Sequence, residues 1–256
     1  MAASTGNRPI AKILVSVLGA VVGLFLGKMA WETFQNRPGK IEADFEAAVQ
    51  NDPEIGPMFQ AFRQYFPNDY AALKTEMVAQ HRAGVSPAAL NLTGFNRMAA
   101  FRKAHARELA LAPSPELQAF RKSQAALMNG LAAESTTMCA QYTFATIKPG
   151  HRPSPKVQKL LADIGAVQFR AIAAGQKTPA KRDLDTLPEA DGNALIAQME
   201  RAGLSDRQRA AFLDGTGARS LNEADQCRTG VILTQAIDKL PAEQAERILA
   251  FMTAHS

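Results

Sequence analysis

The sequence predicts an all-α protein, in which a single N-terminal transmembrane helix precedes a multi-helix soluble domain folded as an irregular helical bundle. Three observations predict this fold class. A long apolar run stands near the start, strong helix formers such as Ala, Leu, Gln and Arg dominate the remainder, and helix-start patterns of Ser-Pro or Pro-x-Glu recur. Strand signals are nearly absent, because no turn dipeptide separates two stretches of alternating apolar and polar residues.

The apolar run extends from Ile13 to Trp31, about 19 residues, which is close to the roughly 20 that cross a bilayer core as a helix. Lys28 is its one charged residue, near the end, where a long amine can reach the membrane interface. A cleaved signal peptide fits less well, since cleavage after Ala30 or Gly27 would place Lys28 or Phe25 at position −3, where a small residue is needed. A buried core helix or an interfacial helix also fits less well, because every face of the run is apolar. We therefore expect a short cytoplasmic tail at 1–12, an anchor at 13–34 that contacts the lipid bilayer, and a soluble domain at 35–256.

Positive charge hardly distinguishes the two flanks of the anchor, since Arg8 and Lys12 precede it and Arg37 and Lys40 follow it. A very short tail before a first membrane span usually stays in the cytoplasm. We therefore expect a single-pass protein of a bacterial-type inner membrane, with its C-terminal domain on the periplasmic side. The opposite orientation, with the domain facing the cytoplasm, stays open.

Gly19, Gly23 and Gly27 recur at every fourth position within the expected anchor. On a helix they form one stripe without side chains, along which a second helix can approach closely. This stripe predicts self-association or docking on another membrane helix. The alternative is that glycine is simply common in membrane helices.

Helical periodicity and start signals divide the soluble domain into ten expected helices. Two breaks interrupt the pattern: a linker at 148–153 and a stretch rich in charge and turn formers at 175–188. The soluble part is therefore either one bundle or two units, 40–147 and 154–256. The expected helices span 40–51, 54–66, 68–83, 87–110, 115–146, 155–175, 188–202, 206–214, 221–239 and 242–254.

The chain has two cysteines, Cys139 and Cys227, each inside an expected helix and far apart in sequence. An even count in an oxidising compartment favours a disulfide, which would join the two helices across the linker. The alternative is a pair of unrelated buried thiols that pack as small hydrophobic groups. Redox catalysis fits poorly, because no Cys-x-x-Cys pattern is present.

Polar residues flank both cysteines along the chain, and a bridge would bring the two sets together. They form a candidate recognition surface, with a solvated face that hydrogen-bonds locally as the alternative. The two sets are Glu134, Ser135, Thr136, Thr137, Gln141 and Tyr142 beside the first cysteine, and Asn222, Glu223, Asp225, Gln226 and Arg228 beside the second.

No pattern of catalytic, cofactor-binding or metal-ligating residues is recognisable in the sequence. His81, His105, His151 and His255 lack a second ligand at helical spacing, and neither a nucleophile elbow nor a phosphate-binding loop occurs. We expect His105 to be hydrogen-bonded in the core, and His151 and His255 to be exposed. A net charge of +5 without a clustered basic patch argues against a nucleic-acid partner.

These features together predict a membrane-anchored envelope protein with a binding or scaffolding role, a protein partner, no cofactor and no enzymatic activity. Two alternatives stay open. One is an envelope hydrolase that acts on cell-wall polymer, and the other is a membrane-tethered interaction domain that faces the cytoplasm.

Overall fold

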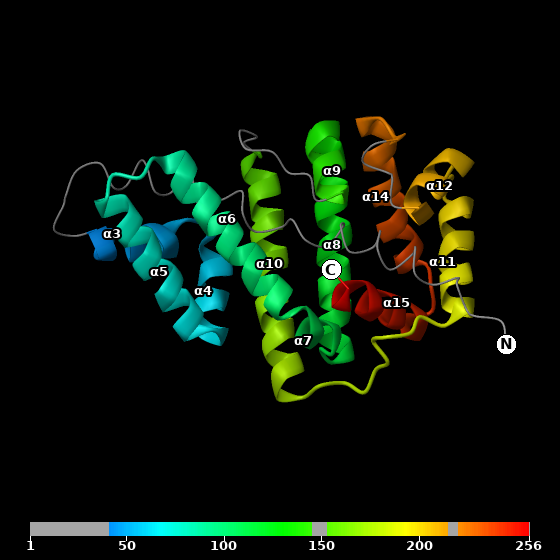
Figure 1. Ribbon diagram of the computed structural model, residues 1–256, viewed down its shortest axis with the longest axis horizontal. Coiled ribbons are helices and arrows are strands. Elements are labelled where there is room, and N and C mark those ends of the chain that lie inside the picture. Colours follow the sequence, from blue (N-terminus) through cyan, green and yellow to red (C-terminus); the bar gives the residue numbers. More distant parts are fainter. Residues whose placement is uncertain (1–40, 145–152, 215–219, 256) are drawn as a thin grey trace.

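Helices make up the architecture of the computed structural model, which describes residues 41–144, 153–214 and 220–255 (Figure 1). Those residues form twelve helices and no strand, so the all-α prediction is confirmed for this part of the chain. The expected tail, the anchor at 13–34 with its stripe of Gly19, Gly23 and Gly27, and most of the linker at 148–153 lie outside the described residues. Among the helices described, none combines the length and the apolar character of a membrane span.

The helices stand side by side in a row, and α7 (Ala106–Ala110) and α15 (Ala242–Ala254) lie along one edge (Figure 1). From one end the row runs through α3, α5 and α6 to α4, then α10, then α8 with α9, then α14, and ends at α11 and α12. The helix α15 crosses the lower edge of this view, where it packs against α7 and α8. The helices are α3 (Ile41–Asn51), α4 (Gly56–Tyr65), α5 (Pro67–Arg82), α6 (Pro87–Ala104), α7 (Ala106–Ala110), α8 (Ser114–Glu134), α9 (Thr136–Thr143), α10 (Pro155–Lys177), α11 (Glu189–Arg201), α12 (Asp206–Asp214), α14 (Glu223–Asp238) and α15 (Ala242–Ala254).

One hydrophobic cluster extends through the row, from Phe45 in α3 to Met252 in α15. Its aromatic part lies where α4, α6 and α10 meet. The rings of Phe62 and Phe169 stack with their centroids 4.6 Å apart, and the ring of Phe101 meets Phe62 edge-on at 5.2 Å. Such offset and edge-on pairs are the favoured arrangements of aromatic side chains. Both expected units contribute to the cluster, because α10 packs against α4 and α8.

Serine caps occur at two of the helix starts that a Ser-Pro pattern marks in the sequence. The Ser86 hydroxyl accepts a hydrogen bond from the Ala89 amide before α6, and the Ser154 hydroxyl accepts one from the Val157 amide before α10. Both helices have proline in their first turn, where a missing N–H costs nothing. Ser114 differs: it is the first residue of α8, and its hydroxyl donates to the Glu246 carboxylate in α15 at 2.6 Å.

Two expected helices are wrong because each is broken into two. The helix expected at 87–110 is interrupted at His105, whose φ of −111° and ψ of 18° lie outside the α-helical range. The helix expected at 115–146 is interrupted at Ser135, which is extended at φ −157° and ψ 116°. The Ser135 hydroxyl accepts a hydrogen bond from the Met138 amide, so this serine ends α8 and caps α9.

The break expected at 175–188 is present, starting after Lys177, and it is tied to the core. Leu184 and Leu187 are buried, and the Ala180 amide donates to the Leu111 carbonyl at 2.8 Å. The Arg182 guanidinium, only 8% exposed, pairs with Glu246 of α15 at 3.0 Å. This segment therefore connects the C-terminal end of α10 to α11 and packs beside α7 and α15.

Candidate functional site: the surroundings of the Cys139–Cys227 bridge

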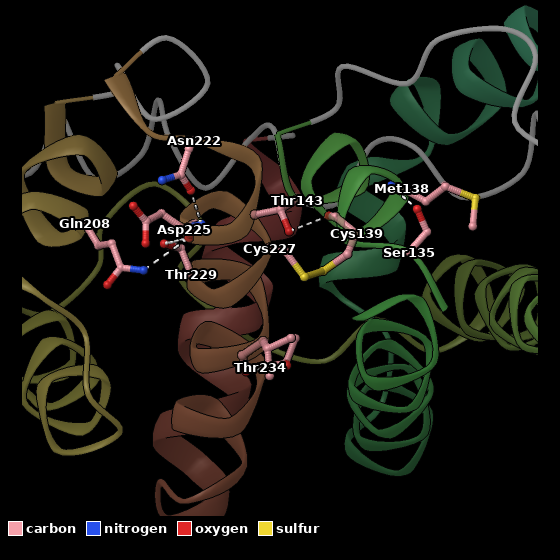
Figure 2. The surroundings of a disulfide bond; sticks show 11 residues. Ser135, Met138, Cys139, Thr143, Gln208, Asn222, Asp225, Cys227, Thr229 and Thr234 are labelled. Atoms are coloured by element: carbon pink, nitrogen blue, oxygen red, sulfur yellow. Dashed lines mark hydrogen bonds between the residues drawn. A yellow bond between two sulfur atoms is a disulfide. The ribbon is translucent and has the colours of Figure 1, made fainter. Parts of the chain in front are cut away.

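The two cysteines lie at disulfide-bonding distance between α9 and α14 (Figure 2). Their sulfur atoms are 2.01 Å apart and their Cα atoms 5.0 Å apart, across a sequence separation of 88. Cys139 is fully buried and Cys227 is 7% exposed. Since reduction requires a thiolate to reach one of the sulfurs, this burial protects the bond.

Both cysteines follow a helix cap by one turn, and these caps place them level with one another. The Ser135 cap precedes Cys139 by four residues, and the Cys139 amide donates to the Ser135 carbonyl at 2.9 Å. The Asn222 cap precedes Cys227 by five residues, and its side chain accepts from the Asp225 amide at 2.8 Å. Because each helix starts at a defined residue, the pair meets in the first turns of α9 and α14.

Close backbone approach accompanies the bridge. A Cβ atom built on Gly230 of α14 would overlap the hydroxyl of Thr143 and lie 2.8 Å from the terminal methyl group of Met128. The same Thr143 hydroxyl donates to the Cys139 carbonyl at 2.9 Å, which holds it against α14 (Figure 2). Glycine at 230 is therefore a packing requirement of the α9–α14 contact.

On its other side, α14 is joined to α12 by buried polar contacts. The Gln208 side chain, 2% exposed, donates to the Asp225 carbonyl at 3.2 Å, and the Thr229 hydroxyl donates to the same carbonyl at 2.7 Å (Figure 2). Gln208 in turn accepts from the Ser205 amide at 3.0 Å. These hydrogen bonds give partners to buried polar atoms, which would destabilise the fold if they had none.

The expected recognition surface is only partly present, because three of its members are buried. Gln141, Tyr142 and Gln226 are 7%, 3% and 8% exposed, and Gln226 donates to the Leu221 carbonyl at 2.8 Å. The two polar sets do meet, since the Thr137 hydroxyl donates to the Glu223 carboxylate at 2.5 Å. Ser135 and Asn222 form local hydrogen bonds to backbone amides, as the solvated-face alternative expects, whereas Glu134 and Arg228 bond to the Ser154 amide and the Gly203 carbonyl in other segments.

Tyr142 is the most unusual polar side chain near the bridge. Its hydroxyl is buried and has no hydrogen-bond partner among the described residues. Burial raises the pKa of the Tyr142 hydroxyl above its ordinary value, while the charge of Arg102 acts in the opposite direction. Burial also lowers the pKa of Arg102 to about 10, and the interaction with Tyr142 partly offsets this.

The carboxyl groups with a displaced pKa are all displaced downwards, the direction opposite to that of a general acid. In Asp191, hydrogen bonds from Arg247 lower the pKa most, with Nε 2.6 Å from Oδ2. In Glu46 and Glu246, burial raises the pKa, but hydrogen bonds and nearby cations together lower it by more, so the net shift is downwards. Each of these carboxylates is engaged in an ion pair between helices or with the 178–188 segment.

The histidines offer no ligand set. His105 packs against Phe101 and Phe66 at the edge of the core, with Nδ1 3.4 Å from Glu108 Oε1, close to the expected environment. His255 is half-buried rather than exposed, since its ring packs against Phe251 and Nδ1 lies 2.8 Å from the Phe251 carbonyl. His151 lies outside the described residues. Within the described part of the chain, no three His, Cys, Asp or Glu side chains are placed to hold a metal ion.

A shallow open groove of about 870 Å³ lies between α5 and α6, and the sequence reasoning missed it. Small side chains line most of it, and Arg97 crosses it to Glu76 with a 2.9 Å contact. Alanines in a helical pattern indicate only helix propensity, so their exposure on one surface could not be read from the sequence. The lining residues are Ala72, Thr75, Glu76, Ala79, Thr93, Asn96, Arg97 and Ala100.

No protein-family description, curated protein or solved structure matches this chain.

Proposed function

We propose that this protein is a membrane-anchored helical protein of the cell envelope with a binding or scaffolding role, without enzymatic activity. Its anchor is the apolar segment 13–34, and its helical domain faces the periplasm from a bacterial-type inner membrane. The single observation that carries this proposal is the Cys139–Cys227 pair at bonding distance. Disulfides persist in the periplasm and are rare in the cytosol, so the pair favours the oxidising side of the membrane.

The placement of the pair strengthens this argument. The chain contains no other cysteine, so a bridge here leaves no thiol for exchange. Both sulfurs belong to the hydrophobic cluster and sit between two packed helices, which is typical of a structural rather than a catalytic disulfide. Such a bond needs an oxidising compartment only once, when the domain folds.

Two observations support binding over hydrolysis. Cleavage of a glycosidic bond needs a carboxylic acid whose pKa is raised by its surroundings, whereas hydrogen bonds and nearby cations lower the pKa of Glu46, Asp191 and Glu246. The groove between α5 and α6 is open and lined mainly by small side chains, which suits surface contact more than chemistry. A protein partner, or a second copy of the chain, would be reached through the stripe of Gly19, Gly23 and Gly27.

The test is a pair of C-terminal reporter fusions on the full chain, combined with alkaline extraction of membranes. We expect an alkaline phosphatase fusion to be active, a green fluorescent protein fusion to be dark, and both to remain in the extracted membranes. Val22→Arg should release the protein from the membrane, because a charge at the centre of a span costs about 3 kcal/mol. Lys28→Arg is the matched control, because it keeps the charge at the interface.

Two results would overturn the proposal. A fluorescent and phosphatase-inactive pair would place the domain in the cytoplasm. Recovery of the unaltered chain in the aqueous extract would remove the anchor.

A further inference from the structure

The burial of Cys139 depends on a helix that comes much later in the chain. Cys139 lies in α9, which packs mainly against α14 and less against α8 among the described helices. Its side chain points from α9 towards α14, where Cys227 lies (Figure 2). Since α14 begins only at Glu223, the side of α9 that carries the Cys139 thiol has no cover until that part of the chain is present.

The helix that carries Cys227 meets its partners in the opposite order. α14 packs against α8, α9, α11 and α12, which all precede it, and of the described helices only α15 follows it. The contacts beside the bridge agree, because Gly230 packs on Thr143 of α9 and the Gln208 side chain of α12 donates to the Asp225 carbonyl. Once Cys227 is present, α14 can therefore dock on partners that are already there.

The order of the chain gives Cys139 an interval in which it is exposed. The expected anchor precedes the helical domain, so on export Cys139 enters the periplasm before Cys227. The two cysteines are 88 positions apart and synthesis adds about 5–20 residues each second, so about 4–18 s separate them. Disulfide formation takes from seconds to hours depending on the oxidant, so a fast oxidant can react within this interval.

In the folded domain the accessibility of the two sulfurs is reversed. Cys139 is fully buried, whereas Cys227 is 7% exposed. Thiol exchange requires that the attacking and attacked sulfurs reach each other. An oxidant of the folded, reduced domain would therefore meet Cys227 first, whereas an oxidant that acts during entry meets Cys139 first.

We propose that a periplasmic thiol oxidase binds this chain covalently through Cys139 before α14 has docked, and that Cys227 then resolves the intermediate. This inference rests on the proposed function, because it needs the domain on the oxidising side of the membrane. It identifies the partner by its chemistry, as an enzyme with a reactive disulfide. No isomerase is needed, since two cysteines allow a single intramolecular pairing.

The reaction has two exchange steps. The Cys139 thiolate attacks the oxidase disulfide, which breaks, so that one oxidase sulfur stays bonded to Cys139 and the other leaves as a thiolate. Docking of α14 brings the Cys227 thiolate to Cys139, where it forms the native bridge and displaces the bonded oxidase sulfur. Two electrons pass from the chain to the oxidase, and the two protons lost by the cysteines balance the two that the oxidase thiolates take up. Burial of both sulfurs then protects the product from reversal.

The test traps the intermediate in cells that make the full chain. Cys227→Ser removes the resolving thiol, and Cys139→Ser is the matched control, because each variant keeps one cysteine and loses the same bridge. After a short metabolic pulse, cells are quenched in acid, free thiols are blocked with N-ethylmaleimide, and the chain is separated by electrophoresis with and without dithiothreitol. A mixed disulfide survives denaturation, so the readout does not require either variant to fold.

We expect Cys227→Ser to give several-fold more of a high-mass, reductant-sensitive adduct than Cys139→Ser. Mass spectrometry of this adduct should find Cys139 joined to a cysteine of a thiol–disulfide oxidoreductase. Equal adducts on the two variants, more adduct on Cys139→Ser, or a disulfide dimer of the chain in its place would each refute the proposed order. So would the absence of an adduct from both variants.

These outcomes are distinguishable from failure of the proposed function. If the wild-type chain carries the bridge and its phosphatase fusion is active, a wrong or missing adduct refutes only the route through Cys139. A wild-type chain without the bridge refutes this inference as well. If its phosphatase fusion is also inactive, the periplasmic placement fails with it.

Discussion

Opening the Cys139–Cys227 bridge should remove a large part of the stability of this domain. The bridge closes a loop with a sequence separation of 88, and such a cross-link lowers the entropy of the unfolded chain. For a loop of that length, the loss of the constraint costs about 4.5 kcal/mol at 25 °C. In a domain of about 200 residues, this corresponds to a fall in Tm of about 9–18 °C.

The assay is urea unfolding of the full chain in detergent, followed by circular dichroism at 222 nm, with and without reductant. The reduced wild type is the primary comparison, because it keeps both sulfur atoms and loses only the covalent link. Cys139→Ala combined with Cys227→Ala should lose somewhat more, since it also removes buried sulfur from the core. The reasoning is refuted if oxidised and reduced wild type differ by less than about 1 kcal/mol, because the loop constraint would then contribute little.

Three further substitutions test the packing and the charges. Gly230→Ala should lose about 1–3 kcal/mol in thermal unfolding, because its methyl group meets the Thr143 hydroxyl, and adding Thr143→Ala should recover part of the loss. Asp191→Asn should lose about 2 kcal/mol at pH 7, because Arg247 loses a charged acceptor. The Asp191 pKa is lowered in the folded state, so its contribution is present above its ordinary value of 3.8 and is lost as the pH falls below it. Stability curves measured against pH should therefore be flatter in that acid range for Asp191→Asn than for wild type. Arg182→Lys should lower Tm, because one ammonium group cannot reach all four groups that the guanidinium contacts. These groups are the carbonyls of Ala110 and Ala112, the Ser114 hydroxyl and the Glu246 carboxylate. An unchanged Tm would contradict that role.

Most helix starts were predictable, because they depend on short-range chemistry. A serine followed by proline satisfies free amides and fits the first turn, as at Ser86 and Ser154. Burial along α15 was equally predictable, since Ile248 and Leu249 recur at helical spacing and are both buried.

The interruptions were not predictable from periodicity. The apolar helical pattern continues past both His105 and Ser135, and the short helices that follow them, α7 and α9, pack against helices far away in sequence. Ser135 did carry a signal, because serine followed by two threonines is a common cap, but the long apolar stripe outweighed it.

The site was predictable only as a pairing of cysteines. Three features of the site depend on contacts between segments far apart in sequence. They are the need for glycine at position 230, the burial of Tyr142, and the hydrogen bond from Gln208 in α12 to α14. The small-residue groove between α5 and α6 was missed for the same reason, since exposed alanines resemble any other helix former in the sequence.

The most direct test of the central claim counts free thiols on the full chain taken from living cells. Cells are quenched in acid to block exchange, and the denatured protein is then treated with a polyethylene-glycol maleimide that adds visible mass for each thiol. A domain folded in the periplasm should gain no tag before reduction and two tags after it, from Cys139 and Cys227. Two tags on the unreduced chain would contradict the account, because both sulfurs would then be free where the protein resides.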